Sequence, residues 1–298
     1  MKAISVSRAS DFLARNIIKL LGWSAIIILI AICAFLFQGA MKALGEVGLL
    51  SLIGGKSWFP TSAEAEFGFL PAEVGSFWVT AMALAVCVPL GIAAALYLSE
   101  FASPRVKEIG KMLVEFIAAI PSVVFGLIGL TFLVPWIQNS LHLESGLTAL
   151  CAGLMVGFMC LPTIISISED AMHAVPDDLR RGSLALGNTR WQTARKIVLP
   201  AASSGIFAAI MLGLGRAIGE TMIVLMLAGN AGIIPHSPLL AARTMTGTIA
   251  QETGEVVRGG LHYSVLFAMG LVLFVQTFIL NAIAGTLLDR QKRKWQVS

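Results

Sequence analysis

An all-α bundle of membrane-spanning helices is the fold class that this 298-residue sequence predicts. Hydrophobic residues make up 57% of the chain and charged residues only 13%, and the mean hydropathy is +0.84, far above that of soluble globular domains. The apolar runs are about 20 residues long and do not alternate with polar residues, as the strands of a membrane barrel do. Helices, which satisfy their own backbone hydrogen bonds, are therefore expected to cross the bilayer.

Six apolar windows are long enough to form these helices. They are residues 18–37, 75–98, 110–136, 146–167, 202–228 and 263–287. The first window is too long for the apolar core of a typical signal peptide, so we expect an uncleaved helix. Sixteen Lys and Arg residues flank one side of the predicted bundle and four flank the other, which places both termini in the cytoplasm. The expected organisation is a cytoplasmic N-terminal segment (1–17), a transmembrane domain (18–287) with a cytoplasmic loop (169–200), and a basic cytoplasmic tail (288–298).

Helix contacts and kinks are predicted from small residues and prolines. Pairs of glycines four residues apart allow helix backbones to approach closely, and two such pairs are Gly153 with Gly157 and Gly215 with Gly219. Prolines inside a window are expected to kink it, because a proline cannot donate the helical hydrogen bond. The prolines expected to do so are Pro89, Pro121 and Pro162.

Two full charges stand inside the fifth window, in the sequence GLGRAIGETM. Arg216 and Glu220 are four residues apart and would share one face of a continuous helix. Each charge at the bilayer centre is unfavourable by about 2.5–3.5 kcal/mol, so the pair is expected to face water or another helix. One hypothesis is that the guanidinium of Arg216 lies in an aqueous path and binds an anion, with Glu220 as the counter-ion of Arg216. The alternative, that the two residues form an ion pair that only holds helices together, stays open. Thr221 and Ser122 are candidate hydroxyl contacts along the same path.

The loop between the fourth and fifth windows is predicted to be structured. Pro176, followed by Asp177 and Asp178, is typical of a helix start, and Gly187 of a helix end. Thr189 is a plausible N-cap for a second short helix that leads to Pro200. Either a solvated surface helix or a docking element for a soluble partner fits this pattern.

The end of this loop resembles the signature loop of ABC importer permeases. Gly187 is followed by nine residues and Ile197, and one residue later come Leu199 and Pro200. In that family the loop is a coupling helix that docks on an ATPase subunit. The resemblance thereby assigns coupling to Leu184, Ala185, Leu186, Gly187, Asn188, Arg190, Leu199 and Pro200. The sequence departs from the family pattern Glu-Ala-Ala at Arg181, Gly182 and Ser183, so a contact of that glutamate is not expected here.

Further segments resemble the C-type permease subunit of phosphate-specific (Pst) importers. They are WFP at 58–60, FGFLP at 67–71, EFIAAIPSVVFG at 115–126, GLGRAIGETM at 213–222 and GGLHYSVLFAMGLVLFV at 259–275. The resemblance implies a type I ABC importer fold in a bacterial or archaeal cytoplasmic membrane, with Arg216 and Glu220 on the translocation path. It also implies an A-type permease partner, two ATPase subunits that bind Mg-ATP, and an external phosphate-binding protein.

The sequence lacks the motifs of a nucleotide-binding, metal-binding, catalytic or nucleic-acid-binding site. GGKSW at 54–58 is no P-loop, because Leu50 stands where the first glycine is required. The histidines and cysteines show no metal-ligand spacing, no catalytic triad pattern is present, and the basic residues flank apolar windows instead of forming a nucleic-acid surface. We therefore expect no enzyme activity, metal or cofactor in this chain. Rival functions are import of another oxyanion (phosphonate, sulfate or molybdate), an ATP-independent anion channel or carrier, and a non-transporting scaffold or phosphate-sensing partner.

Overall fold

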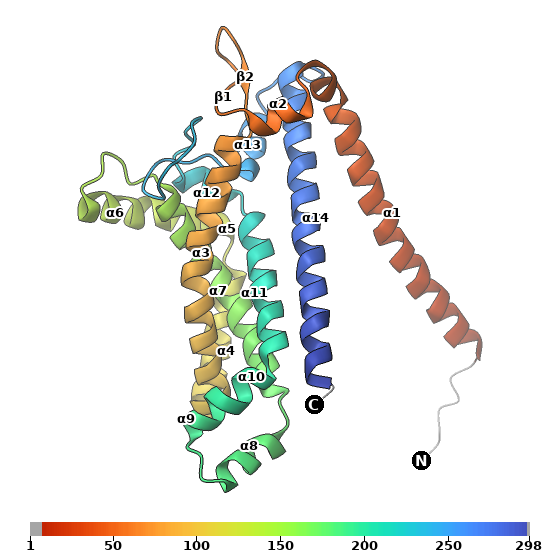
Figure 1. The fold of residues 1–298 in the computed structure, drawn as a ribbon, viewed down its shortest axis with the longest axis vertical. Coiled ribbons are helices and arrows are strands. Elements are labelled where there is room, and N and C mark those ends of the chain that lie inside the picture. Colours follow the sequence, from red (N-terminus) through yellow and green to blue (C-terminus); the bar gives the residue numbers. More distant parts are fainter. Residues whose placement is uncertain (1–7, 297–298) are drawn as a thin grey trace.

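A computed structural model describes the backbone of residues 8–296 and the side chains of residues 13–286. Residues 1–7 of the expected N-terminal segment and residues 297–298 of the tail lie outside the described range. Long helices run side by side through most of the molecule, and a short antiparallel hairpin lies at one end (Figure 1). We call this end the hairpin end.

The elements follow in chain order. They are α1 (Arg8–Glu46), α2 (Leu49–Gly54), β1 (Trp58–Phe59), β2 (Glu66–Phe67), α3 (Leu70–Leu96), α4 (Pro104–Ala119), α5 (Ser122–Ile128), α6 (Val134–Leu141), α7 (Ala149–His173), α8 (Asp177–Ala185), α9 (Arg190–Thr193), α10 (Leu199–Ala201), α11 (Ser203–Ile218), α12 (Met222–Leu227), α13 (Met245–Glu252) and α14 (Leu261–Gln296). Three π-helical turns join some of them: Tyr97–Phe101, Gly129–Leu133 and Ala194–Val198.

Helices α3 and α7 form the centre of the bundle, and α11 packs beside both. A Cβ on Gly153 would lie 2.5 Å from the Cβ of Met82, and one on Gly157 would lie 2.9 Å from the carbonyl oxygen of Ala83. Neither position has room for a side chain. The predicted close approach at this glycine pair is therefore confirmed, and it is made against α3.

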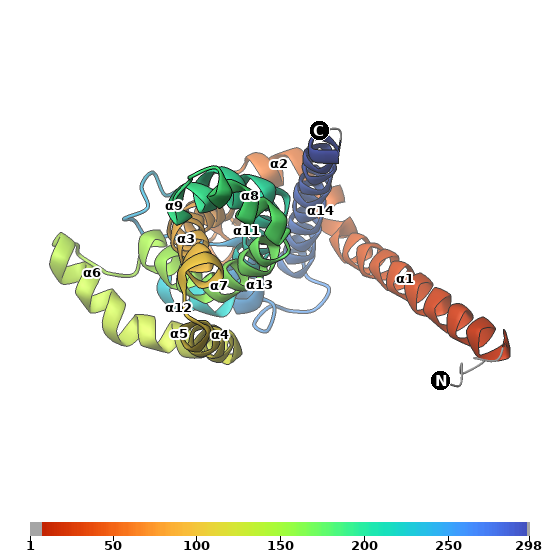
Figure 2. The same ribbon diagram turned by 90° about the horizontal axis from the view of Figure 1, so that it is seen from below.

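The kink predicted at Pro121 in the window 110–136 is present, and it is a full break. The backbone breaks at Ile120 and Pro121 between α4 and α5, and residues Ser122–Leu141 then form one helix whose far end, α6, lies away from the bundle (Figures 1 and 2). Pro121 breaks the helix because its ring occupies the amide that would have bonded to the preceding turn. By contrast, α3 and α7 continue through Pro89 and Pro162.

The expected continuous helix over 202–228 is wrong. The direction changes by 69° between Arg190–Ala201 and Ser203–Ile218, and α11 ends at Ile218, with three residues between it and the start of α12 at Met222. In the described range, five helices are long and apolar enough to cross a membrane, or six if the bent pair counts as one span. This agrees with the predicted all-α membrane bundle.

Helix α1 contacts α14 near the hairpin end and then leans away from the bundle (Figures 1 and 2). Phe35 and Phe267 make an edge-to-face contact there, with ring centroids 5.4 Å apart. Helices α8 and α9 lie at the opposite end of the molecule. The first residues of α1 and the last residues of α14 are directed toward this same end (Figure 1). We call this the α8 end.

Candidate functional site

Arg216 lies in the last turn of α11, directly before the break between α11 and α12. Its side chain is exposed, and Nη1 donates a hydrogen bond to Oγ1 of Thr163 on α7 at 3.0 Å. Thr163 is one residue after Pro162, and sequence reasoning did not single it out. The bond to Thr163 holds the Arg216 side chain against α7, and its exposure leaves the guanidinium able to bind an anion.

Glu220 lies inside the break and is 9% exposed. Its Oε1 accepts a hydrogen bond from the backbone amide of Ile223 at 3.1 Å, in the first turn of α12. Its backbone carbonyl accepts a second one from Oγ1 of Thr246 at 2.7 Å. A carboxylate in this position satisfies a free amide at a helix N-terminus. The expectation that Arg216 and Glu220 share a helix face is wrong, because the helix ends between them.

Thr221 and Ser122 occupy less central places. Thr221 is half-buried in the break, and its Oγ1 donates to the carbonyl of Gly219 at 3.3 Å. Ser122 is half-buried at the start of α5, which packs chiefly against α12; a Cβ on Gly126 would lie 2.5 Å from Sδ of Met226. The structure thus brings Thr221 next to Glu220 and places Ser122 on a neighbouring helix.

The glycine pair beside Arg216 is uncovered in this chain. A Cβ on Gly215 would meet nothing within 4 Å, and one on Gly219 would meet only carbonyl oxygens of its own turn. Both glycines are exposed. This face therefore has room for another subunit. Because Gly215 and Gly219 have no side chains, the backbone of that subunit could approach the backbone of this chain closely.

The 176–200 segment has the predicted helix, turn and helix. Helix α8 begins at Asp177 after Pro176, and Gly187 has φ +84°, a conformation that side chains disfavour. Thr189 accepts from the amide of Gln192, and the Gln192 side chain accepts from the amide of Thr189, which forms a capping box. Leu199 and Pro200 form α10 at the 69° bend.

The outer surface of this segment is rich in exposed apolar side chains. Leu184 is 46% exposed, Leu186 86% and Trp191 54%, and Ala185 and Arg190 are exposed beside them. Asn188 points inward and donates from Nδ2 to Oγ of Ser183 at 3.1 Å. An apolar ridge of this kind, rimmed by charge, suits a protein partner.

Ser183, which replaces the second alanine of the family pattern Glu-Ala-Ala, connects α8 to α9. Ser183 is buried, and its Oγ lies 2.9 Å from Oγ1 of Thr193. This contact ties α8 to α9 across the Gly187 turn. Arg181 and Gly182 are exposed on the other side of α8.

Comparison with known families decides the class of protein. The family model for binding-protein-dependent transport system inner membrane components matches residues 87–294. The chain belongs to this family. It is 39% identical to the probable ABC transporter permease protein YqgH of Bacillus subtilis (strain 168), with 89% of this chain and 90% of the relative covered. It is 36% identical to the phosphate transport system permease protein PstC of Mesorhizobium japonicum, with 90% and 87% covered.

Solved structures of ABC importers share the fold. One is a bacterial alginate ABC transporter in complex with an alginate-bound periplasmic protein, with a TM-score of 0.65 and 15% identity over 94% of this chain and 96% of that chain. Another is the inward-facing MetNI methionine ABC transporter, with a TM-score of 0.56 and 18% identity over 75% and 94%. The type I importer architecture is therefore shared despite low identity.

Family membership fixes the general role of this permease. It is a multi-pass inner-membrane component, and in such systems separate ATPase subunits hydrolyse ATP and a substrate-binding protein delivers the substrate. No group of three or more His, Cys, Asp or Glu side chains that could hold a metal ion occurs in the described part of the chain.

Sequence reasoning missed the ion-pair clusters of this permease. Near the α8 end, Glu169 is 1% exposed and lies 2.7 Å from Nζ of Lys107 and 2.6 Å from Nζ of Lys111. Both lysines are on α4, so the cluster joins α4 to α7. Glu169 lies two residues after the end of the fourth window, and the two lysines lie four residues apart near the start of the third window. This spacing is the signal that was available in the sequence.

The second cluster gathers around Glu252 at the hairpin end. Its carboxylate accepts from Nε1 of Trp58 at 3.0 Å and pairs with Arg243 at 2.5 Å and with Nε2 of His262 at 2.8 Å. It therefore ties the hairpin to α13 and α14. A cavity of about 610 Å³ opens beside it, and its lining includes Trp58, Arg243 and His262.

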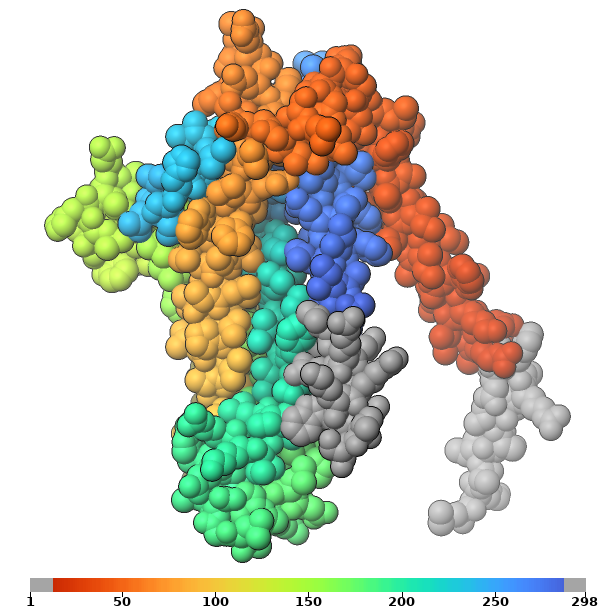
Figure 3. Space-filling view, viewed as in Figure 1, coloured from red at the N-terminus to blue at the C-terminus, as the bar shows by residue number. Residues whose placement is uncertain are grey.

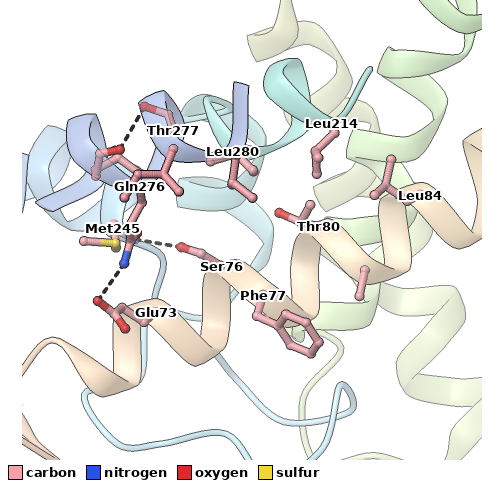
Figure 4. Close-up of a pocket in the computed structure, with 14 residues that line it drawn as sticks. Glu73, Ser76, Phe77, Thr80, Leu84, Leu214, Met245, Gln276, Thr277 and Leu280 are labelled. Carbon is pink, nitrogen blue, oxygen red and sulfur yellow. Dashed lines mark hydrogen bonds between the residues drawn. The ribbon is translucent and has the colours of Figure 1, made fainter. Parts of the chain in front are cut away.

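A further cavity, of about 600 Å³, lies between α3, α11 and α14 (Figure 4). Its walls are mostly apolar, and Leu84, Leu214 and Leu280 are among the side chains that line it. At one end Nε2 of Gln276 donates to Oε1 of Glu73 at 3.0 Å. Arg216 does not line this cavity, and the apolar walls suit lipid or another helix better than an anion.

Proposed function

We propose that this permease is a membrane-spanning subunit of an ATP-driven phosphate importer. The observation that carries the proposal is its 30–36% identity, over 90% or more of the chain, to PstC phosphate permeases from three bacteria. The exposed guanidinium of Arg216 at a helix break supports the same substrate class, because a membrane path for phosphate needs a positive group that is not fully neutralised.

The path passes the break between α11 and α12 in this proposal. Arg216 binds the anion, while Thr221 and Ser122 offer hydroxyls along the way and Glu220 limits how tightly the anion is held. The broken helix supports this assignment, since irregular backbone at membrane depth is tolerated where it is buried in protein or lines an aqueous cavity.

We infer that an A-type permease covers the open face beside Arg216. Space-filling representation shows α1 separated from the bundle by a wide gap over much of its length (Figure 3). The most apolar stretch of Leu13–Glu46 has none of its residues buried in this chain. Together with the uncovered Gly215 and Gly219, this leaves room for a second subunit between α1 and the bundle.

The two ends of the molecule receive the other partners. The α8 end faces the cytoplasm, where the exposed ridge around Leu186 docks on an ATPase subunit that binds Mg-ATP. The hairpin end faces outward, where the loops 39–74 and 230–261 form one surface through the Glu252 cluster and receive the phosphate-binding protein.

Reconstitution tests the function directly. This chain is co-expressed with an A-type permease and an ATPase subunit, placed in liposomes, and supplied with the phosphate-binding protein and radiolabelled phosphate. The expected result is phosphate entry that requires ATP and survives an excess of sulfate, molybdate or phosphonate. Entry without ATP would favour a channel or carrier, competition by another oxyanion would change the substrate, and no flux would favour a scaffold.

A further inference from the structure

We propose that Arg180 and Glu100 form a mechanical link that transmits movement of the 176–200 segment to helix α3. The inference rests on the proposed docking of that segment on an ATPase subunit. It makes Arg180 and Glu100 positioning residues, which act on the transport path through the helices that they join.

Arg180 uses its guanidinium to hold three pieces of backbone together. Nε and Nη2 donate to the carboxylate of Glu100, at 3.3 Å and 3.0 Å to Oε1. Nη2 also donates to the carbonyl of Met172 at 2.7 Å, and Nη1 donates to the carbonyl of Val175 and to Oδ1 of Asp177. Arg180 is on α8, Met172 is at the end of α7, and Glu100 continues α3.

The central pair is well shielded from water. The side chains of Arg180 and Glu100 are 17% and 11% exposed, whereas Asp177 is 75% exposed. Donation of hydrogen bonds to the Glu100 carboxylate raises the pKa of the Arg180 guanidinium, which therefore stays charged. A forked guanidinium against a carboxylate is directional and stiff, which a lysine in the same place would not be.

Glu100 is placed where a displacement reaches the transport path. It lies in the π-turn Tyr97–Phe101, which continues α3 without a break. Helix α3 in turn packs along α7, which carries Thr163, and against α11, which carries Arg216. A shift of α8 must therefore move α3 with it or break the bonds of Arg180.

A second connection from α8 follows a different route. Ser183 bonds to Thr193, and from there the chain runs through α10 into α11. The two connections would move α3 and α11 together. Without the Arg180 link, α8 would keep its chain connection to α7 and its route to α11, but α3 would follow only through the apolar packing of Ala95 and Leu96. ATP hydrolysis would then switch the bundle less completely.

The test compares Glu100→Gln and Arg180→Lys with the unmodified chain in the reconstituted complex. Assembly, ATPase rate and phosphate entry per ATP are measured. Both variants are expected to assemble and hydrolyse ATP, with phosphate entry per ATP reduced about tenfold. The matched control Asp177→Asn removes only the exposed partner of the same guanidinium and is expected to transport normally.

Clear outcomes overturn the link. Unchanged phosphate entry per ATP in Glu100→Gln would do so, and so would a failure of every variant to assemble, which would make the pair a folding element. Absence of ATP-dependent phosphate entry in the unmodified complex would instead defeat the proposed function. The link would then be measured with the anion that the complex does carry.

Discussion

Arg216 and Glu220 lie four residues apart in the sequence but bond to different parts of the bundle. Arg216 donates to Thr163 on α7 at 3.0 Å, whereas Glu220 accepts from the amide of Ile223 on α12 at 3.1 Å. The carboxylate is therefore engaged in closing the helix break. The guanidinium keeps free donors on an open face, which is the arrangement that anion binding requires.

Arg216→Gln is expected to reduce phosphate uptake at least about tenfold, because a hydrogen bond to a charged group contributes about 1.5–3 kcal/mol. The complex is expected to assemble all the same, because glutamine keeps a side-chain amide that can donate to Oγ1 of Thr163. Uptake and recovery of the intact complex are measured together. Normal uptake by this variant would remove Arg216 from the path.

Thr163 provides a graded companion to that variant. Thr163→Val keeps the shape of the side chain but removes the acceptor for Nη1, and Thr163→Ser keeps the hydroxyl. Valine is expected to lower uptake by about fivefold, as for the loss of one orienting hydrogen bond of about 1 kcal/mol, and serine to change it little. Equal uptake by both variants would show that Thr163 does not orient Arg216.

Two substitutions of Glu220 can separate its hydrogen bond to the amide of Ile223 from its negative charge. Glu220→Gln keeps an oxygen that can accept from the amide of Ile223, and Glu220→Ala does not. Alanine is expected to destabilise the chain by about 1 kcal/mol, as for loss of a helix N-cap, whereas glutamine should leave the stability near that of the unmodified chain. Thermal unfolding of the purified complex measures both.

Phosphate uptake by Glu220→Gln then reports the charge alone. We expect uptake to fall although assembly is kept, because Arg216 would hold the anion more tightly without a nearby carboxylate. If glutamine destabilises the chain as much as alanine does, the cap depends on the charge and the two roles cannot be separated in this way.

The fold was predicted well where apolar length decides it. A run of 20 apolar residues has few alternatives to a helix in a membrane, so the helical bundle followed from composition. The break at Pro121 was predictable as a kink, because proline removes a hydrogen bond wherever it stands. The break after Ile218 contains no proline. The available signal was Gly219 followed by Glu220 and Thr221, but these three residues also occur within continuous helices, so the sequence alone did not predict the break.

The candidate site was predicted only in part, since sequence gives a residue's type but not its partners. Arg180 and Arg181 are adjacent and identical, yet only Arg180 reaches Glu100, eighty residues away in the chain. Glu252 gathers Trp58, Arg243 and His262 from distant segments in the same way. Gly187 and Thr189 were located correctly because turns and caps are set by neighbouring residues.

Gly187 and Gly182 offer a matched pair for the coupling turn. A Cβ would meet nothing within 4 Å at either position, but Gly187 has φ +84° and Gly182 is inside α8. Gly187→Ala should therefore cost about 1–2 kcal/mol through backbone strain, while Gly182→Ala should stabilise the helix by about 0.5–1 kcal/mol. Retention of the ATPase subunit during purification is expected to fall for the first variant only. Asparagine at 187 should be tolerated better than alanine. The same retention for both alanine variants would show that the turn is not needed for docking.

Glu169 allows the stability of the α4 to α7 contact to be tested apart from transport. Its carboxylate is 1% exposed between Lys107 and Lys111, so Glu169→Gln leaves two ammonium groups without their shared partner. Removing one member of a fully buried pair costs about 3–5 kcal/mol; because the lysine side chains are 26% and 44% exposed and can reach water, we expect about 1–3 kcal/mol. Asp170→Asn is the control, since Asp170 is 68% exposed and its 3.6 Å contact with Lys111 should contribute less than about 1 kcal/mol. Thermal unfolding of the two variants should therefore differ clearly, and equal unfolding temperatures would mean that the buried carboxylate does not stabilise the joint between α4 and α7.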